Sequence, residues 1–552
     1  MLRVTALALL LAGAAVPAMA QNLQIHGGPI YTGVEAMPRA ELVQVRDGRI
    51  VFAGRAADAP DATGLTDIDL AGATLFPGFT DGHAHLDGIG AREMELNLEG
   101  SASVDEAMAR LKAWAEAHPE GPILGRGWIE TRWPEGRFLT RHDLDAAAPG
   151  RLVALWRADG HATVISSSVL AAAGIDASTV APPGGEILKD AAGQPTGLLV
   201  DAAMDLLGGF WSQIGDNPVS ARDRYRAGFA VYARYGWTGI HFMSAPWDDV
   251  PLMEEMAEAG EASIRVYNSV TPDGAAALFA SGPRSVADGR VITRAVKMYA
   301  DGALGSRGAA LFEPYADRPE TTGLMQIDGE AAVPVYEAAL RSGIQIATHA
   351  IGDRGNHEVT EWYATAMRAV PLDQWDVADP RWRIEHAQIL RPSDYAAFRD
   401  LPIIASMQPS HAIGDFHFAG ARLGDARLDG AYAWNSLVDM GVIVVGGSDA
   451  PVERGDPLIE FYAAVARRDL DGFQGPDWRP QEAVSRETAL KMFTLWPAYA
   501  SFREAELGTI EVGKRADFTA FDIDLMTVPA AEIPHGHAML TVVDGVVVWS
   551  RD

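Results

Sequence analysis

Histidine and aspartate residues end several short apolar runs of this chain, and their positions indicate metal chemistry. His83 and His85 stand two residues apart at the end of the first run, so on a strand both imidazoles face the same side. His349, His386 and Asp449 each end a separate run further along. If the runs are parallel strands of one barrel, their ends converge and these side chains become neighbours. Imidazole and carboxylate groups bind divalent cations, so the pattern predicts a divalent metal site.

A rare lysine lies within another of these runs. The chain has five lysines, and Lys297 is embedded in the apolar stretch 295–300. A buried ammonium beside two divalent cations is strongly disfavoured, whereas a neutral amine can react with carbon dioxide to give a carbamate. The two oxygens of that anion could bridge two metal ions. The alternative is a lysine that reaches the strand end and pairs with Asp301 or with a substrate carboxylate.

Composition narrows the choice of ligands and partners. The chain has 552 residues, of which 48% are hydrophobic, and a formal net charge of −29. The acidic excess argues against binding nucleic acid or an anionic membrane, because both require basic patches. With no cysteine in the chain, disulfides and thiolate metal sites are excluded. The ligands must therefore be histidine, carboxylate or modified lysine, and a small-molecule substrate is the expected partner.

Residues 1–20 read as a cleaved signal peptide. Arg3 supplies a weakly positive start, the apolar run 4–16 follows, and Ala18 and Ala20 fit the small-residue cleavage pattern. We expect Gln21 at the mature N-terminus and a periplasmic or secreted protein. The alternative is an uncleaved membrane anchor, although the run is too short to span a bilayer comfortably. No other segment is apolar enough, so we expect no stable membrane insertion.

The elements that must position the metal ligands alternate between apolar runs and alanine-rich helical stretches. Strands that alternate with helices predict a parallel sheet, and eight such units predict a closed (β/α)8 barrel, here over residues 77–504. The eight runs are 75–83, 238–242, 264–270, 296–300, 344–348, 382–385, 403–407 and 442–446. The fold class is therefore α/β, a TIM barrel with its active site at the carboxyl ends of the strands.

Two further parts are expected around the barrel. Both ends of the chain place Asp-Gly between β-branched residues, a strong hairpin signal, at 47–48 and 544–545. Residues 22–76 and 505–552 are therefore expected to share one small β-sandwich domain, the alternative being two unrelated hairpins. The long stretch 87–215, between the first and second runs, is interpreted as an insertion that covers the active site.

Several motifs of the chain resemble one known family. The motifs are 77–85, 297–307, 349–354, 383–387, 447–451 and 507–517, with 125–128 and 159–161 in the insertion. Together they resemble the YtcJ-like branch of amidohydrolase family 3, in the amidohydrolase superfamily, over nearly all of the mature chain. The resemblance implies that His83, His85, His349, His386 and Asp449 are metal ligands. It also implies that Lys297 is the carboxylated bridge.

This ligand set implies a hydrolytic mechanism with two divalent ions, zinc being the expected metal. His83, His85 and Asp449 would hold one ion, His349 and His386 the other, and Lys297 would span both. A metal-bridging hydroxide would attack a polarised carbonyl carbon, and Asp449 would act as general base and then protonate the leaving nitrogen. The expected reaction is hydrolysis of an amide-type C–N bond other than a peptide bond.

Four residues are expected to contact the substrate: His161, Gln408, His411 and Trp128. The alternative for His161 and His411 is a supporting or loop histidine, and for Trp128 it is packing of the insertion onto the barrel. Other functions also stay open at this point. They are a metal-dependent esterase or lactonase, a mononuclear deaminase, and an inactive binding or regulatory protein on the same scaffold, against which the intact ligand set argues. The sequence leaves the physiological substrate and a homo-oligomeric state undecided.

Overall fold

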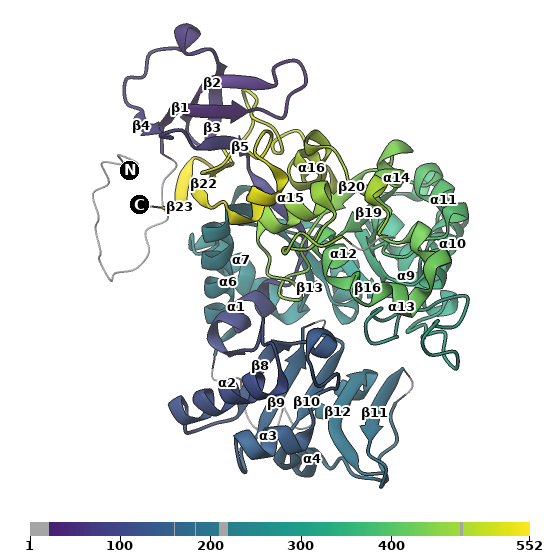
Figure 1. Ribbon diagram of the computed structural model, residues 1–552. Coiled ribbons are helices and arrows are strands. Elements are labelled where there is room, and N and C mark those ends of the chain that lie inside the picture. The colour runs from purple at the N-terminus through teal and green to yellow at the C-terminus, as the bar shows by residue number, and fades with distance from the viewer. Residues whose placement is uncertain (1–20, 159, 183, 209–218, 475–477, 552) are drawn as a thin grey trace.

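The computed structural model describes residues 21–551 except 159, 183, 209–218 and 475–477. The expected signal peptide lies outside the described residues. Three parts are visible in Figure 1: a sheet built from both ends of the chain, a central barrel, and an insertion on the opposite side of the barrel from that sheet. Among the described residues no helix is long and apolar enough to cross a membrane.

Eight parallel strands form the barrel, as the sequence predicted. In chain order they are β6 (Phe79–Ala84), β13 (Trp237–Ala245), β14 (Arg265–Val270), β16 (Val291–Tyr299), β17 (Gln345–Ala350), β18 (Trp382–His386), β19 (Ile403–Met407) and β20 (Val444–Gly446). Each pairs in parallel with the next, and β15 (Arg284–Val286) adds an antiparallel edge to β16. The strands are buried almost throughout, which is why they read as continuous apolar runs.

The first and last barrel strands meet just beyond the end of β20. Asp449 donates its backbone N–H to the carbonyl of His83 at 2.7 Å. The buried Asp81 carboxylate accepts hydrogen bonds from the backbone N–H and the hydroxyl of Ser448, at 2.9 and 2.5 Å, and from the Tyr232 hydroxyl at 2.9 Å. The Asp81 carboxylate thus links the first barrel strand to the loop after the last one, beside His83 and Asp449.

Helices follow the strands and cover the outside of the barrel (Figure 1). They are α6 (Ala221–Tyr235), α7 (Val250–Glu258), α8 (Ala275–Ser281), α9 (Gly329–Ser342), α10 (Asp353–Ala369), α11 (Tyr395–Asp400), α12 (Pro409–Asp415), α13 (Ala419–Leu423), α14 (Trp434–Asp439), α15 (Pro457–Ala466), α16 (Arg486–Phe493) and α17 (Leu495–Ala500). Local signals set their ends: Ser220 caps the start of α6, and Gly236 ends it in the left-handed conformation. Their apolar faces and the barrel strands share one large core.

Strands from both chain ends pair in one eight-stranded sheet. Its order is β23-β22-β21-β5-β1-β2-β3, with β4 beside β1. The strands are β1 (Leu23–Tyr31), β2 (Arg39–Arg46), β3 (Arg49–Gly54), β4 (Thr66–Asp69), β5 (Thr74–Pro77), β21 (Phe518–Phe521), β22 (Ala538–Val543) and β23 (Val546–Ser550). Both Asp-Gly turns have positive φ at both residues, as two-residue hairpins require. The described strands form a single sheet, so the sandwich arrangement stays a prediction.

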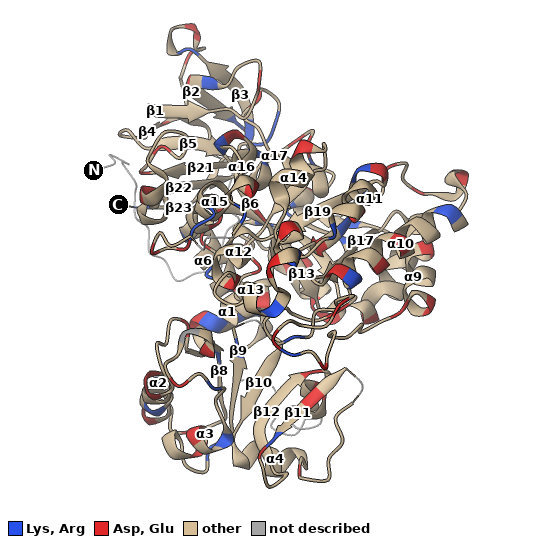
Figure 2. Cartoon of the chain, turned by 45° about the vertical axis from the view of Figure 1, so that its right-hand side comes forward, with Lys and Arg blue, Asp and Glu red and all other residues tan. Residues whose placement is uncertain are grey.

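The stretch between β6 and β13 carries a sheet and apolar clusters of its own. The sheet order is β11-β12-β10-β9-β8-β7. Its elements are α1 (Leu86–Met94), β7 (Leu96–Asn97), α2 (Val104–Ala117), β8 (Ile123–Trp128), α3 (Arg141–Ala147), β9 (Val153–Arg157), β10 (Ala162–Ile165), α4 (Ser167–Ala173), β11 (Gly185–Lys189) and β12 (Pro195–Asp201). Figure 2 shows this sheet beyond the barrel, and the basic residues do not gather on one face in that view.

Candidate active site

A cavity of about 870 Å³ lies between the carboxyl ends of the barrel strands and the insertion. Five of the six predicted metal ligands line it: His85, Lys297, His349, His386 and Asp449. The insertion supplies the opposite wall with residues 99–100, 126–127, 157–161 (159 aside), 201–202 and 204–205. The insertion therefore forms one wall of the chamber whose other wall carries the ligands.

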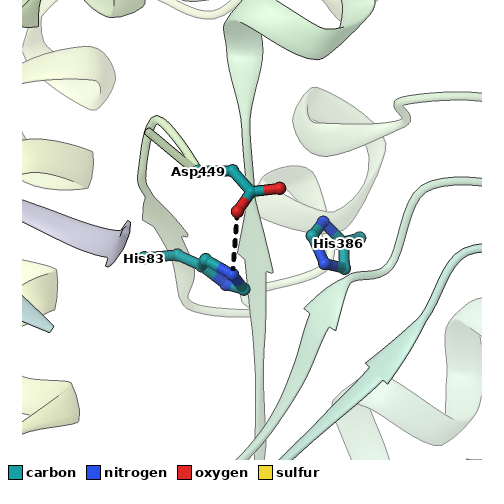
Figure 3. A group of neighbouring side chains, drawn as sticks. All are labelled: His83, His386 and Asp449. Atoms are coloured by element: carbon teal, nitrogen blue, oxygen red, sulfur yellow. Dashed lines mark ion pairs between the residues drawn. The ribbon is translucent and has the colours of Figure 1, made fainter. Parts of the chain in front are cut away.

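The predicted ligands gather at one point on the barrel wall (Figure 3). One ligand atom each from His83, His386 and Asp449 lie within 4.8 Å of one another. The Asp449 Oδ1 atom is 3.0 Å from Nε2 of His85 and 3.4 Å from Nε2 of His83. The His349 ring packs against His386 with a centroid separation of 4.5 Å.

Two atoms of this cluster, His83 Nε2 and Asp449 Oδ1, are buried and form no hydrogen bond among the described residues, although they lie 3.4 Å apart and Asp449 Oδ1 lies 3.0 Å from His85 Nε2. Buried polar atoms seldom lack a partner, and a cation between them would supply one. Burial also lowers the pKa of His349 and of His386 well below the usual value, which favours the neutral imidazole that binds metals. Burial alone would raise the pKa of Asp449, but His83 and His85 hold it well below its usual range. The residues therefore fit a divalent cation.

Lys297 is buried on β16 at the side of the cavity. Burial lowers its pKa to about 8, although Glu385 and Asp449 oppose the change. Within the described part of the chain it forms no ion pair. The Asp301 carboxylate, a partner considered from the sequence, instead accepts backbone N–H groups of Ala310, Ile351 and Gly352 at 2.8–2.9 Å. The lysine is thus buried beside the ligands without a carboxylate partner.

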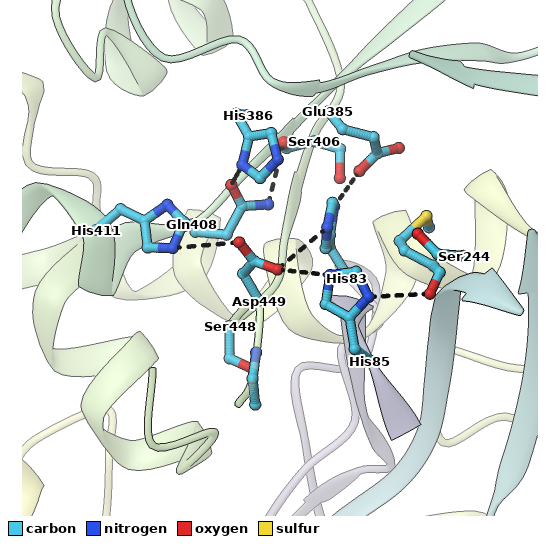
Figure 4. Close-up of polar contacts among 12 residues, drawn as sticks. His83, His85, Ser244, Glu385, His386, Ser406, Gln408, His411, Ser448 and Asp449 are labelled. Atoms are coloured by element: carbon cyan, nitrogen blue, oxygen red, sulfur yellow. Dashed lines mark hydrogen bonds and ion pairs between the residues drawn. The ribbon is translucent and has the colours of Figure 1, made fainter. Parts of the chain in front are cut away.

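Hydrogen bonds to Nδ1 orient three of the imidazoles (Figure 4). Nδ1 of His83 lies 2.5 Å from Glu385 Oε2, and Nδ1 of His85 lies 3.0 Å from the carbonyl oxygen of Met243. Nδ1 of His386 lies 2.8 Å from Oε1 of Gln408. Because each acceptor fixes Nδ1–H, each Nε2 is left for a metal ion, an arrangement typical of metal-binding histidines.

The sequence prediction missed Glu385 and its partner Arg383. Arg383 is fully buried and donates to the carbonyl oxygen of Gly82 at 2.6 Å, to the Ser406 hydroxyl at 2.7 Å and to Glu385 at 3.1 Å. Burial alone would raise the pKa of Glu385, but Arg383 and His83 hold it well below its usual range. The available signal was two charged residues at alternate positions of the apolar β18, which places both on one face of the strand.

Two of the four predicted substrate contacts line the cavity. His161 faces it from the insertion, and its Nδ1 lies 2.7 Å from Asp201 Oδ1. His411 lines it from α12, with Nε2 at 3.5 Å from Asp449 Oδ2. Gln408 does not line the cavity. Its side-chain carbonyl oxygen instead accepts a hydrogen bond from Nδ1 of His386. The structure therefore gives Gln408 a positioning place in the site rather than the predicted substrate contact.

Trp128 is also placed differently from the prediction. Its side chain is fully buried in the core of the insertion, where Nε1 donates to the carbonyl of Leu155 at 2.9 Å. The register of β8 shifts between Arg126 and Trp128, and Gly127 between them has a φ of +96°. This bulge breaks the usual alternation, so Arg126 faces the cavity and Trp128 packs inside. Trp128 therefore packs inside the insertion, neither on the cavity wall nor between the insertion and the barrel.

Comparison with known proteins establishes the family. A sequence model described as the amidohydrolase family matches residues 67–549. The chain belongs to the amidohydrolase family. The family predicted from the motifs is confirmed, and a small-molecule substrate is implied for this amidohydrolase.

Individual relatives agree with this assignment. The amidohydrolase is 33% identical to the putative amidohydrolase YtcJ of Bacillus subtilis, over 95% of this chain and 99% of that protein. It is 28% identical to the N-substituted formamide deformylase of Arthrobacter pascens, over 93% of this chain and 95% of that protein. A crystal structure of an uncharacterized metal-dependent hydrolase from Pyrococcus furiosus superposes with a TM-score of 0.72 at 26% identity, covering 91% and 99% of the two chains. The protein is a metal-dependent hydrolase of this family.

Proposed function

We propose that this amidohydrolase hydrolyses an amide-type C–N bond, other than a peptide bond, with two divalent ions, zinc being the expected metal. The observation that carries the proposal is the cluster at the cavity wall, where His83 Nε2 and Asp449 Oδ1 are buried, face each other and form no hydrogen bond among the described residues. The relative that is an N-substituted formamide deformylase supports the choice of bond.

Each residue of the cluster has a part in this proposal. His83, His85 and Asp449 hold one ion, and His349 and His386 hold the other. When bound, the ions lower the pKa of a bridging water towards neutrality and polarise the substrate carbonyl. Asp449 is ionised and lines the cavity, so it is suited to accept the proton of the attacking water and to return it to the leaving nitrogen.

The test is a substrate screen of the purified mature protein with metal analysis. Families of N-formyl amines, N-acyl amines, lactones and esters are offered to the metal-loaded enzyme. We expect turnover of amides that disappears with the metal, and loss of at least about 100-fold in kcat for Asp449→Asn. Asp400→Asn, at an exposed carboxylate on the surface, is the matched control. Turnover of esters or lactones alone would replace the proposal with an esterase, and no turnover at all would favour a binding protein.

We propose further that Lys297 is carboxylated and bridges the two ions. The support is its burial beside Asp449 and His349 without an ion-pair partner in the described part of the chain. Lys297→Ala should lower the metal content while the barrel stays folded, and short carboxylic acids should partly restore activity by occupying the vacated place. Lys297→Arg should not substitute, because a guanidinium stays charged and cannot form a carbamate. A bare ammonium in a fully active, metal-loaded enzyme would contradict the bridge.

Export is proposed from residues 1–20 alone. Mass spectrometry of protein recovered from the periplasm or the medium should give an N-terminus at or near Gln21. Intact Met1 on protein recovered from the cytoplasm would overturn the proposal. Whether the protein forms a homo-oligomer stays a prediction that light scattering would settle.

A further inference from the structure

Arg126 presents a positive charge to the cavity and forms no ion pair with a described carboxylate, although Asp449, Glu95 and Glu99 act on it from a longer distance. It lies on β8 of the insertion, on the cavity wall. Its one hydrogen bond among the described residues is a long contact of 3.4 Å from NH2 to the carbonyl of Ala158. Its Nε is buried and has no partner there, and no acidic side chain of the described residues lies within ion-pairing distance. A partly buried guanidinium in this state is ready to bind an anion.

The other arginines of the cavity wall are neutralised. Arg157 forms a bidentate ion pair with Glu130, in which Nε and a terminal nitrogen of the guanidinium donate to the two carboxylate oxygens at 2.8 and 3.0 Å. Arg454 pairs with Glu99 at 3.3 Å, and about half of its side chain is exposed at the mouth. The unneutralised charge of Arg126 is therefore a local property of its place in the wall.

Arg126 is also close to the loops that carry metal ligands. A Cβ atom added to Gly88, three residues after His85, would come within 3.0 Å of Arg126 NH1 and within 2.9 Å of Pro451. Pro451 follows Asp449 by two residues. The guanidinium thus lies where the loops after the first and last barrel strands meet. Burial lowers its pKa to about 10, which leaves it cationic at neutral pH.

The cavity also contains carboxylates, but several have partners of their own. Asp201 binds His161, and Asp415 accepts hydrogen bonds from Gln388 at 2.9 Å and from the Tyr432 hydroxyl. Asp469 accepts two backbone N–H groups, at 2.8 and 3.0 Å. None of these three is paired with Arg126, so an anion that enters the cavity finds its cationic partner there.

We propose that Arg126 binds a carboxylate of the substrate. The preferred substrates are then N-formyl or N-acyl compounds with a carboxylate near the scissile amide, as in N-acyl amino acids. This inference rests on the proposed amide hydrolysis and narrows its substrate class. A planar guanidinium binds a planar carboxylate through two parallel hydrogen bonds, a bidentate geometry. Such charged pairs are among the strongest single contacts in recognition.

The test compares N-acetylalanine with N-acetylalaninamide, in which a neutral carboxamide replaces the carboxylate, and follows acetate release so that only cleavage of the N-acetyl bond is counted. Wild-type enzyme should prefer the acid, and Arg126→Met should lower the ratio of kcat/KM for acid over amide by about 10- to 100-fold. Arg126→Lys should fall between the two, because lysine keeps the charge and loses the fork. Arg454→Met is the matched control, since it removes a neutralised arginine from the same wall and should leave the ratio unchanged. Equal metal content in all variants shows that the cluster is intact.

A binding measurement separates this inference from the proposed function. Isothermal titration with N-acetylalanine in the metal-loaded Asp449→Asn background, where turnover is slow, should show affinity about 10- to 100-fold weaker when Arg126→Met is added. If amides are hydrolysed but the acid-to-amide ratio and the affinity do not change in Arg126→Met, the inference is overturned while the function stands. If no amide is hydrolysed, the proposed function fails, and the titration alone decides whether Arg126 is an anion site.

Discussion

Asp201 holds His161 from a backbone conformation that suits glycine alone. Its φ is +48° and its ψ −127°, a region that costs a residue with a side chain about 1–3 kcal/mol. Asp201 ends β12, and its carboxylate meets Nδ1 of His161 at 2.7 Å on the cavity wall. We predict that replacing Asp201 with glycine raises stability and lowers activity, because the strained backbone places the carboxylate that orients His161 towards the substrate.

Two variants isolate the strain. Asp201→Gly removes both the strain and the carboxylate, whereas Asp201→Asn removes the charge and keeps the strain. Relief of about 1–3 kcal/mol, less about 0.5–1 kcal/mol for the added freedom of the unfolded chain, gives a range of about 0–2.5 kcal/mol, with the glycine variant expected to be about 1 kcal/mol more stable than the asparagine variant. The glycine variant should lose about 10- to 100-fold in kcat/KM because His161 loses the partner that fixes its ring, and the asparagine variant should lose less because its amide oxygen can still accept a hydrogen bond from Nδ1.

The assay is denaturant unfolding of the metal-loaded variants, with kcat/KM measured on the best amide from the screen. An asparagine variant as stable as the glycine variant would refute the strain argument. A glycine variant with wild-type kcat/KM would show that Asp201 does not hold His161 for the reaction. The metal content should be the same in all three proteins, because neither Asp201 nor His161 belongs to the ligand cluster.

Three further predictions follow from contacts described by the structure. Glu385→Gln should weaken metal affinity about 10- to 100-fold in chelator competition, because His83 loses its charged acceptor; unchanged affinity would contradict that role. Asp544 pairs with Arg265, Arg290 and Arg515, which hold its pKa well below the usual range although burial alone would raise it. The contribution of Asp544 to the free energy of unfolding is therefore complete above the unfolded pKa of about 3.9 and is lost as the pH falls. Asp544→Asn should lower the free energy of unfolding by about 3 kcal/mol at neutral pH and by much less at about pH 3. An equal loss at both pH values would count against the network. Trp128→Phe should leave KM unchanged and lower thermal stability, since the ring packs in the insertion core. A raised KM would indicate instead that Trp128 contacts the substrate.

The histidine and aspartate side chains of the cluster could be singled out from the sequence because they follow apolar runs, whereas Lys297 lies within one. His349 and His386 need only the knowledge that parallel strands converge at one end of a barrel. Glu385, which orients His83, could not be assigned in the same way, because its partner lies 302 positions away and depends on how the strands are paired. Paired residues across a barrel become visible only when the register is known.

The insertion shows a second limit. Arg126 and Trp128 are two apart on β8, and simple alternation would place both on one face. The bulge at Gly127 sends them to opposite sides, which overturns the expectation that Trp128 faces the cavity. Turn and bulge geometry of this kind depends on contacts such as the approach of Gly127 to Glu99, 28 positions earlier, which no local pattern specifies.

The contact between β6 and the loop after β20 determines the stage of folding at which this protein can bind its metal ions. Asp81 and Ser448 are 367 positions apart, and His83 meets Asp449 only when that contact forms. A nascent chain that has not yet released its last barrel strand therefore lacks Asp449, and its other predicted ligands are not yet held together by a closed barrel. If residues 1–20 direct the transport of an unfolded chain, the metal is taken up at the destination, and the supply of ions in that compartment determines which metal the enzyme carries.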